Sequence, residues 1–322
     1  MYEFRSGLKE SINSFLNYRE ALGYSRKSQT ALLKGFDAFC ARHYPDEAHL
    51  SKDMAIEWLE EQTSGLYNKS TMLRNLGKYL TAIGLESFEM PRGMYYEKKS
   101  FSAYIFNDDE LRTLFLAIDS MPTVKSEPFL TAIFPVMIRL VYTCGLRPNE
   151  GRELLANNVC LKSGEILITN TKLKKDRIVV MSDDMLQLCI EYNNLRNVFA
   201  GGNDYFFPSW NGGSFTSKQI NTHFQSCWKR ANAESDTSSI PRVRVYDLRH
   251  RFASAALNRW LDQAEPLGVK LSYLRAYMGH STLSETAHYI HLLPENLVKS
   301  AGIDWQVFDE VVPNPLAAGV EL

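Results

Sequence analysis

The stretch YDLRHRFAS, residues 246–254, sets the character of this chain, because it places an arginine within a helical pattern of apolar residues. Tyr246 and Arg249 are three positions apart, so a helix would carry both on one face. Two further strings hold arginine, histidine and tyrosine: CGLRPNE at 144–150 and MGHSTLSETAHYIH at 278–291. Together the strings indicate a site built from cations and a phenol, without carboxylates at metal-ligand spacing.

The sequence around these strings predicts a domain at 106–322 that is mainly α with a small antiparallel β-sheet, an α+β fold. Helical patterns cover NDDELRTLFLAI, PFLTAIFPVMIRLVYTCG, DMLQLCIEYNNLRN, TSKQINTHFQSCWKRAN, VYDLRHRFASAALNRW and LSYLRAYMG. Asn107 or Asp108 is the expected N-cap of the first of these helices. The runs EILIT and RIVVM are typical of strands, and the polar TKLKKD between them predicts a hairpin turn.

Residues 1–90 predict a separate helical domain. Four helical patterns follow one another with tight links: LKESINSFLNYREALG, KSQTALLKGFDAFCARHY, KDMAIEWLEEQ and STMLRNLGKYLTAIG. Ser25 or Ser28 is the expected N-cap of the second pattern, and Ser51 that of the third. Residues 91–105 contain proline, glycine and basic residues without a clear period, which is typical of an interdomain linker.

Composition is that of a globular protein with a packed core. The 322 residues are 45% hydrophobic and 23% charged, and this length is typical of about two domains. The start MYEFRSGLKESINSF lacks the apolar region of a signal peptide, and no run of about 18 apolar residues predicts a membrane span. Five cysteines without a CxxC pair fit reduced thiols in a cytoplasmic protein better than disulfides or a zinc site.

The net charge of -1 counts against nucleic-acid binding only as an average, because binding requires basic residues on one face. Two local clusters of basic residues exist: Lys172, Lys174, Lys175 and Arg177, then Arg242, Arg244, Arg249 and Arg251. Each cluster forms either a solvated face or a binding surface. Phosphodiester transfer without a metal needs a nucleophile, an acid for the leaving oxygen, and cations that balance charge in the transition state. Arginine suits the last task, because its planar fork meets two phosphate oxygens at once.

The strings show a resemblance to a known family. CGLRPNE is similar to the first arginine motif of the tyrosine recombinases of the phage-integrase type, and YDLRHRFAS is similar to their second. In MGHSTLSETAHYIH, His280 and Tyr289 have the spacing of the family's last motif, and TKLKKD lies where the family has its hairpin lysine. The resemblance spans nearly the whole chain. It implies a SAM-like helical core-binding domain at 1–90 and a catalytic domain at 106–322.

The resemblance also implies a role for each matching residue of the site. Arg147 and Arg249 would clamp the scissile phosphate, and Glu150 would support Arg147. Tyr289 would attack phosphorus, giving a 3′-phosphotyrosine and a free 5′ hydroxyl. His280 would donate a hydrogen bond to a phosphate oxygen and help to place the nucleophile.

Basic residues near the hairpin and the second motif complete the implied site. The family's hairpin lysine, the general acid toward the leaving 5′ oxygen, matches Lys172, and two further lysines in the same turn are close alternatives. Contacts to DNA are expected from Lys174, Lys175, Arg177, Arg242 and Arg244.

The main departure from the family is Tyr246, where the family usually has histidine. A tyrosine donates a hydrogen bond, but with an ordinary pKa of about 10 it does not exchange protons near neutral pH as histidine does. Tyr246 is therefore expected to serve by hydrogen bonding. His250 follows Arg249 directly, so it is expected to point away from the site and to be structural. Tyr273 and Tyr277 are expected to be packing residues.

By the same resemblance the partner is double-stranded DNA with specific recombination sites, and no cofactor or metal is implied. A homotetramer would form on DNA from chains that are monomers or dimers when free, with accessory proteins as further partners. The chain would be cytoplasmic, bacterial or phage-encoded and nucleoid-associated, and its setting ranges from phage integration to transposition of a mobile element. The segment after His291 would pack either on its own domain or on a neighbouring protomer. Two rivals stay open: a relaxing topoisomerase of type IB, and a DNA-binding accessory protein of the same fold that has lost catalysis.

Overall fold

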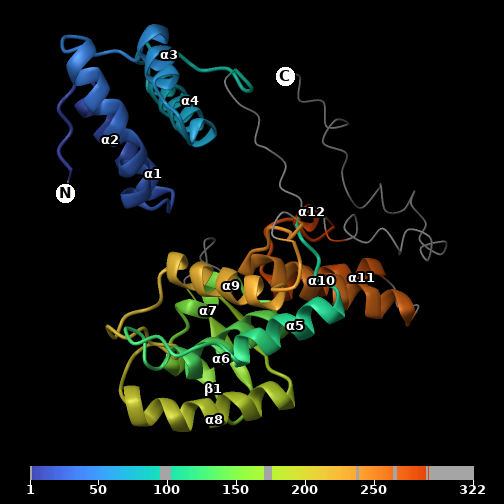
Figure 1. The fold of residues 1–322 in the computed structure, drawn as a ribbon. Coiled ribbons are helices and arrows are strands. Elements are labelled where there is room, and N and C mark those ends of the chain that lie inside the picture. The colour runs from blue at the N-terminus through green and yellow to red at the C-terminus, as the bar shows by residue number, and fades with distance from the viewer. Residues whose placement is uncertain are drawn as a thin grey trace. The chain divides into compact units, whose positions relative to one another are not determined.

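A computed structural model describes residues 2–94, 103–169, 176–236, 239–263, 267–287 and 289. The chain divides into two compact units, an N-terminal unit, Met1–Phe101, and a C-terminal unit, Ser102–Leu322 (Figure 1). The prediction of a mainly helical chain with a small antiparallel sheet is confirmed. The predicted linker at 91–105 lies largely outside the described residues, and the domain limits placed on either side of it stay predictions.

The N-terminal unit is a bundle of α1 (Lys9–Ala21), α2 (Arg26–His43), α3 (Lys52–Glu60) and α4 (Leu66–Ala82). The side chains of Ser25 and Ser51 accept hydrogen bonds from the first turns of α2 and α3, as the sequence predicted. Helix α4 begins at Leu66, earlier than predicted, because Leu66 packs against the apolar core and continues the helical face. The bundle shares one core, in which Phe15 and Phe36 are almost fully buried.

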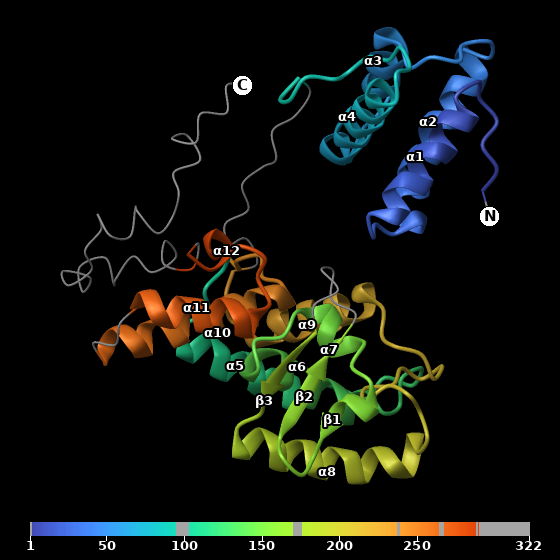
Figure 2. The same cartoon turned by 180° about the vertical axis from the view of Figure 1, so that it is seen from behind.

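The C-terminal unit is built around the apolar helix α6. Its helices are α5 (Asp108–Asp119), α6 (Leu130–Thr143), α7 (Pro148–Arg152), α8 (Asp183–Ala200), α9 (Ser217–Ala231), α10 (Val245–Asp262), α11 (Leu267–Met278) and α12 (Leu283–Ala287), with a 3-10 turn at Ala156–Asn158. Helix α6 contacts α5, α7, α8 and α10. Both views place α8 along one side of the unit, and α11 and α12 on the opposite side (Figures 1 and 2). Asn107 caps α5, one of the two caps predicted.

The small sheet consists of β1 (Val159–Cys160), β2 (Glu165–Ile168) and β3 (Arg177–Val180) in the order β1-β2-β3. Strands β2 and β3 pair antiparallel with Ile168 opposite Arg177, so the predicted pairing of EILIT with RIVVM is confirmed. Ile166, Ile168 and Val179 are buried in the same core as α6. Residues 170–175, which hold most of the predicted turn TKLKKD, lie outside the described residues.

The turn after α6 brings the first arginine motif against α10. Gly145 has a φ of 58°, and a Cβ atom there would lie 2.4 Å from a ring carbon of Phe252. The carbonyl of Gly145 accepts a hydrogen bond of 2.6 Å from Nη1 of Arg249. The absence of a side chain at this position therefore lets the backbone of the first motif approach the helix of the second motif.

We expect Gly145→Ala to lower the free energy of unfolding of the C-terminal unit by about 2 kcal/mol or more, because a positive φ strains alanine and the added methyl collides with Phe252. Urea unfolding followed by circular dichroism measures this loss. Gly202→Ala is the matched control, since Gly202 has a φ of 82° and open space around it. Equal losses in the two variants would contradict a specific contact at Gly145.

Candidate active site

Helix α10 carries the centre of the candidate site. Its first turn is fixed by Asp247, a fully buried residue whose carboxylate accepts hydrogen bonds from the backbone N–H and from Nη2 of Arg244. This cap sets where the helix begins and how it is rotated. The same side of α10 then presents Tyr246, Arg249 and His250, at helical spacings of three and four.

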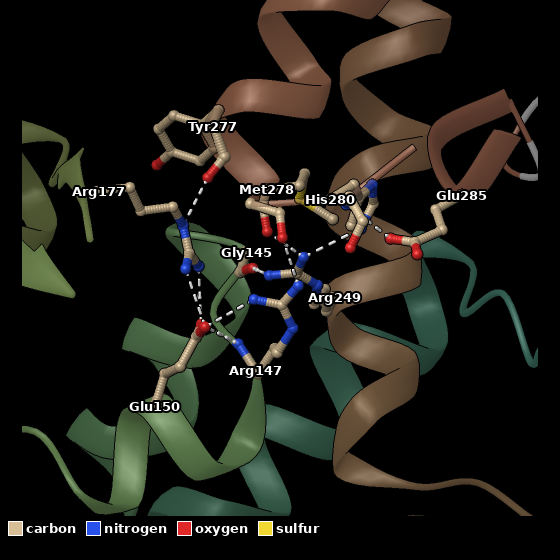
Figure 3. Close-up of polar contacts among 11 residues, drawn as sticks. Gly145, Arg147, Glu150, Arg177, Arg249, Tyr277, Met278, His280 and Glu285 are labelled. Carbon is tan, nitrogen blue, oxygen red and sulfur yellow. Dashed lines mark hydrogen bonds and ion pairs between the residues drawn. The ribbon is translucent and has the colours of Figure 1, made fainter. Parts of the chain in front are cut away.

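Arg249 is fully buried, and its guanidinium is held by backbone carbonyls. Nη1 donates to the carbonyl of Gly145 at 2.6 Å, and Nη2 donates to that of Met278 at 2.5 Å (Figure 3). Nη2 also lies 3.1 Å from Nε2 of His280. Burial, followed by the charge of Arg147, lowers the pKa of Arg249 below its ordinary value. Within the residues the structure describes, no carboxylate hydrogen-bonds this cation.

Arg147, by contrast, is paired with a carboxylate. It is the N-cap of α7, and Glu150 accepts hydrogen bonds of 2.8 Å from its backbone N–H and from its Nη1. Nη2 of Arg147 donates to the carbonyl of Gly279 at 2.7 Å. Burial raises the pKa of Glu150, but the bonds and charge of Arg177, followed by the bonds of Arg147, outweigh burial and hold this pKa at about 2. Glu150 is therefore ionised, and it fixes the orientation of Arg147.

His280 is neutral in this arrangement. Its Nε2 lies against an arginine N–H, which can only donate, so Nε2 accepts and the ring proton is on Nδ1. Nδ1 lies 2.8 Å from Oγ1 of Thr286, a fully buried hydroxyl that can accept this proton's hydrogen bond. Burial, followed by the charges of Arg249 and Arg147, lowers the pKa of His280 to about 3.

Tyr289 lies between two imidazole rings. Its ring centroid is 5.8 Å from that of His280, with the rings nearly parallel, and 5.4 Å from that of His250. Its backbone N–H donates to the carbonyl of Thr286 at 3.1 Å. The residue is only 3% exposed and packs with apolar side chains of α10 and α11, including Leu257. Burial raises the pKa of Tyr289 to about 12, against a lowering by Arg249.

The expectation for His250 was wrong. Its ring lies 5.1 Å from that of Tyr246 and contacts the ring of Tyr289, so it belongs to the site. The error came from comparing His250 with Arg249, its neighbour, and not with Tyr246, which is four positions away and therefore on the same helical face. The packing role expected of Tyr273 was also wrong, because this side chain is 68% exposed on α11.

The structure brings together several of the residues singled out in the sequence. Six of them meet at one place: Arg147, Glu150, Tyr246, Arg249, His280 and Tyr289. Lys172, Lys174 and Lys175 lie outside the described residues. Arg177, for which a DNA contact was expected, lines the groove, but its side chain is 8% exposed and both terminal nitrogens bond to Glu150. Arg244 lines the groove described next, and Arg242 is exposed away from the groove lining.

A groove of about 1390 Å³ opens over the site. Arg147, Tyr246 and His280 lie in its lining, whereas Arg249 and Tyr289 are buried behind it. Further polar residues of the lining were not singled out from the sequence: Asn149, Arg152, Ser217, Lys218, Asn221 and Arg275. Lys218 and Asn221 lie in the first turns of α9, and only the tertiary fold shows that this helix end faces the same groove.

Two features are absent from the described residues. No helix among them is long and apolar enough to cross a membrane. No group of histidine, cysteine and carboxylate side chains in the same part of the chain could hold a metal ion.

Known structures share this fold. The Tn1549 transposon integrase in complex with transposon right end DNA matches with a TM-score of 0.61 at 14% identity, over 87% of this chain and 94% of that one. The XerH site-specific recombinase, bound to palindromic difH substrate in a post-cleavage complex, matches with a TM-score of 0.59 at 19% identity, over 87% and 80% of the two chains. This chain therefore shares the fold of these two DNA recombination proteins.

Sequence comparison leads to the family. Residues 106–296, more than half of the chain, match the phage integrase family, and the chain belongs to it. A putative integrase/recombinase of Sinorhizobium fredii is 26% identical over 297 residues, which cover 90% of this chain and 93% of that protein. The chain is accordingly an enzyme of the tyrosine-recombinase type.

We expect the low pKa of His280 to make the fold sensitive to acid. The folded protein keeps His280 neutral down to about pH 3, whereas the unfolded chain protonates it near pH 6.5, so the unfolded state binds more protons between these values. Stability from this source is complete above about pH 6.5 and is lost as pH falls toward 3. Between pH 7.5 and pH 5, the urea midpoint of unfolding should therefore fall further in the unchanged protein than in His280→Asn. Parallel midpoints would count against a neutral His280 in the folded protein.

Proposed function

We propose that this chain is a site-specific recombinase of the integrase or transposase type, which cuts and rejoins DNA through a 3′-phosphotyrosine formed on Tyr289. One observation carries the proposal: Arg249 is a fully buried cation with carbonyls and a neutral imidazole as its hydrogen-bond partners. A buried charge is costly until an opposite charge compensates it. A phosphate beside Arg249 and Arg147 would supply that charge.

The two arginines have different tasks in this proposal. Arg147 lines the groove with its side chain 29% exposed, and Glu150 holds its fork from behind, so it can receive a non-bridging phosphate oxygen. Arg249 is buried behind the groove and adds charge that water screens little. Together they would stabilise the extra charge on phosphorus in the transition state.

Bond making and breaking follow from these positions. The Tyr289 oxygen would bond to phosphorus as its proton passes to water in the groove, and the bond from phosphorus to the 5′ oxygen would break. That oxygen would take a proton from a hairpin lysine, for which Lys172 is our assignment. A hydroxyl from another strand would later attack the phosphotyrosine and release Tyr289, so the energy of the broken bond is kept and no ATP is needed.

The DNA partner is supported by the relatives, since the Tn1549 integrase and XerH structures are complexes with DNA. Basic residues of the groove, among them Arg244, Arg275 and Lys218, would contact the phosphate backbone. We further propose that four chains act together on two DNA sites in the cytoplasm, and that DNA binding weakens as salt rises.

A second candidate is a DNA-binding protein of the same fold with impaired catalysis. Tyr246 favours it, because tyrosine stands where the family usually has histidine. Against it, Tyr246 interacts with Arg147 and raises the pKa of that arginine, after the opposing effect of burial and the larger effect of Glu150. The substituted residue is thus integrated into the site, and the two experiments below separate the candidates.

We expect Tyr289→Phe to bind DNA as tightly as the unchanged protein but to form no covalent adduct, because the attacking oxygen is missing. Trapping on a nicked suicide substrate, followed by denaturing electrophoresis, measures the adduct. Tyr273→Phe is the matched control, since this tyrosine of α11 is 68% exposed, and it should give normal adduct. Adduct formation by Tyr289→Phe would refute the assignment, and its absence from the unchanged protein would favour the second candidate.

We expect Tyr246→His to cleave at least as fast as the unchanged protein, because histidine can donate the same hydrogen bond and can also exchange a proton near neutral pH. Tyr246→Phe should cleave roughly tenfold more slowly, the worth of one hydrogen bond in the transition state. Single-turnover cleavage of the suicide substrate gives both rates. A complete loss of cleavage in Tyr246→His would show that the phenol has a role that imidazole cannot take.

A further inference from the structure

Arg177, the first residue of β3, lines the groove, but its guanidinium is bonded to groups of the protein. Nη1 and Nη2 donate to the two carboxylate oxygens of Glu150 at 2.8 and 2.7 Å, and Nε donates to the carbonyl of Tyr277 at 2.8 Å (Figure 3). Its side chain is 8% exposed, as is that of Glu150. All three nitrogens of the guanidinium are thus engaged with α7 and with the end of α11.

Three arginines hold one short segment of backbone. The consecutive carbonyls of residues 277, 278 and 279 accept hydrogen bonds from Arg177, Arg249 and Arg147 respectively. The bonds to Tyr277 and Met278 are visible in Figure 3. This segment directly precedes His280. A Cβ atom on Gly279 would lie 3.1 Å from Nη1 of Arg177, so the two are in close contact. The position of His280 therefore depends on Arg177 as well as on the two arginines of the site.

Arg177 also sets the charge of the site. Glu150 shares its oxygens between Arg147 and Arg177, which gives the three groups together a charge of +1. With Arg177 alone removed, the buried carboxylate of Glu150 would face Arg147 only, and the pair would be neutral. Arg147 would then keep its place and its phosphate contact, but it would stabilise the extra charge of the transition state less.

We propose that Arg177 is a positioning residue for strand cleavage, which acts through Glu150 and the 277–279 backbone and makes no contact with DNA. The inference rests on the proposed function. It assigns to Arg177 the tasks of leaving Arg147 a net positive charge for the phosphate and of holding His280 in register. These tasks differ from the phosphate contact that a basic residue beside a hairpin would otherwise have.

The test compares Arg177→Met, Glu150→Gln and the double variant. In Arg177→Met we expect cleavage in a single turnover to fall about 100-fold, as for a displaced catalytic group, while the Kd for DNA and its salt dependence stay unchanged. The double variant should cleave at least about tenfold faster than Arg177→Met, because neutralising Glu150 restores the net positive charge of Arg147. The cleavage rate of Arg177→Lys should lie between those of Arg177→Met and the unchanged protein.

Arg139→Met is the matched control. Arg139 forms the same forked pair, with Asp119 at 2.7 Å for both bonds, and it lies outside the groove lining. It should lose stability without losing cleavage. If Arg177→Met does not fold, Arg177→Lys and the double variant carry the same comparison, since the double variant buries no unpaired charge.

Several results would overturn the proposal. Unchanged cleavage in Arg177→Met would show that Arg177 has no positioning role. If the fold-loss of cleavage rate in the double variant equals the product of the fold-losses in the two single variants, Arg177 and Glu150 are not coupled. A weaker Kd with a salt slope reduced by about one would make Arg177 a DNA contact. If the unchanged protein forms no adduct, the proposed function fails separately, and the salt slopes still decide between an inward and a DNA-facing Arg177.

Discussion

The guanidinium of Arg249 joins three parts of the C-terminal unit that are far apart in sequence. From α10 it bonds to the turn after α6 at Gly145 and to the end of α11 at Met278, and it contacts His280 beyond that end. A fully buried cation is costly, and here backbone dipoles and a neutral ring compensate it in place of a hydrogen-bonded carboxylate among the described residues. The fold thus keeps a positive charge at one point that no hydrogen-bonded carboxylate of the described residues balances, and the groove leads to this point.

This positive charge explains how a chain with a net charge of -1 can bind a polyanion such as DNA. For binding a polyanion, the net charge matters less than which basic side chains are already paired with carboxylates. Glu150 is hydrogen-bonded to Arg147, and Arg177 engages both of its carboxylate oxygens. Without that third arginine the pair of Arg147 and Glu150 would be neutral. An acidic residue can therefore sit inside such a site and orient an arginine without cancelling the positive charge that the site requires.

Much of the fold was readable from local chemistry. Serine caps, apolar periodicity and the two β-rich runs predicted helices and a hairpin, because each depends on residues close in sequence. The six residues that meet at the site lie in motifs that could be recognised in the sequence. The pairing of Arg177 with Glu150 could not be predicted from the sequence, because the two residues are 27 positions apart. A lysine-rich neighbourhood is also equally typical of a solvated face. The place of His250 was readable from its spacing to Tyr246, and the short helices α7 and α12 depend on tertiary contacts.

On the proposed mechanism, the resting site and the working site differ in the protonation of His280. Burial and the two arginine charges keep the ring neutral, with Nε2 turned to Arg249 as an acceptor. A phosphate group would neutralise part of that positive field, which would raise the pKa of His280 toward its ordinary value and favour a proton on Nε2. Thr286 suits both states, since its hydroxyl accepts from Nδ1 or donates to it. The donor that stabilises the transition state would therefore form only when DNA is present, while Tyr289 stays protonated and buried until then.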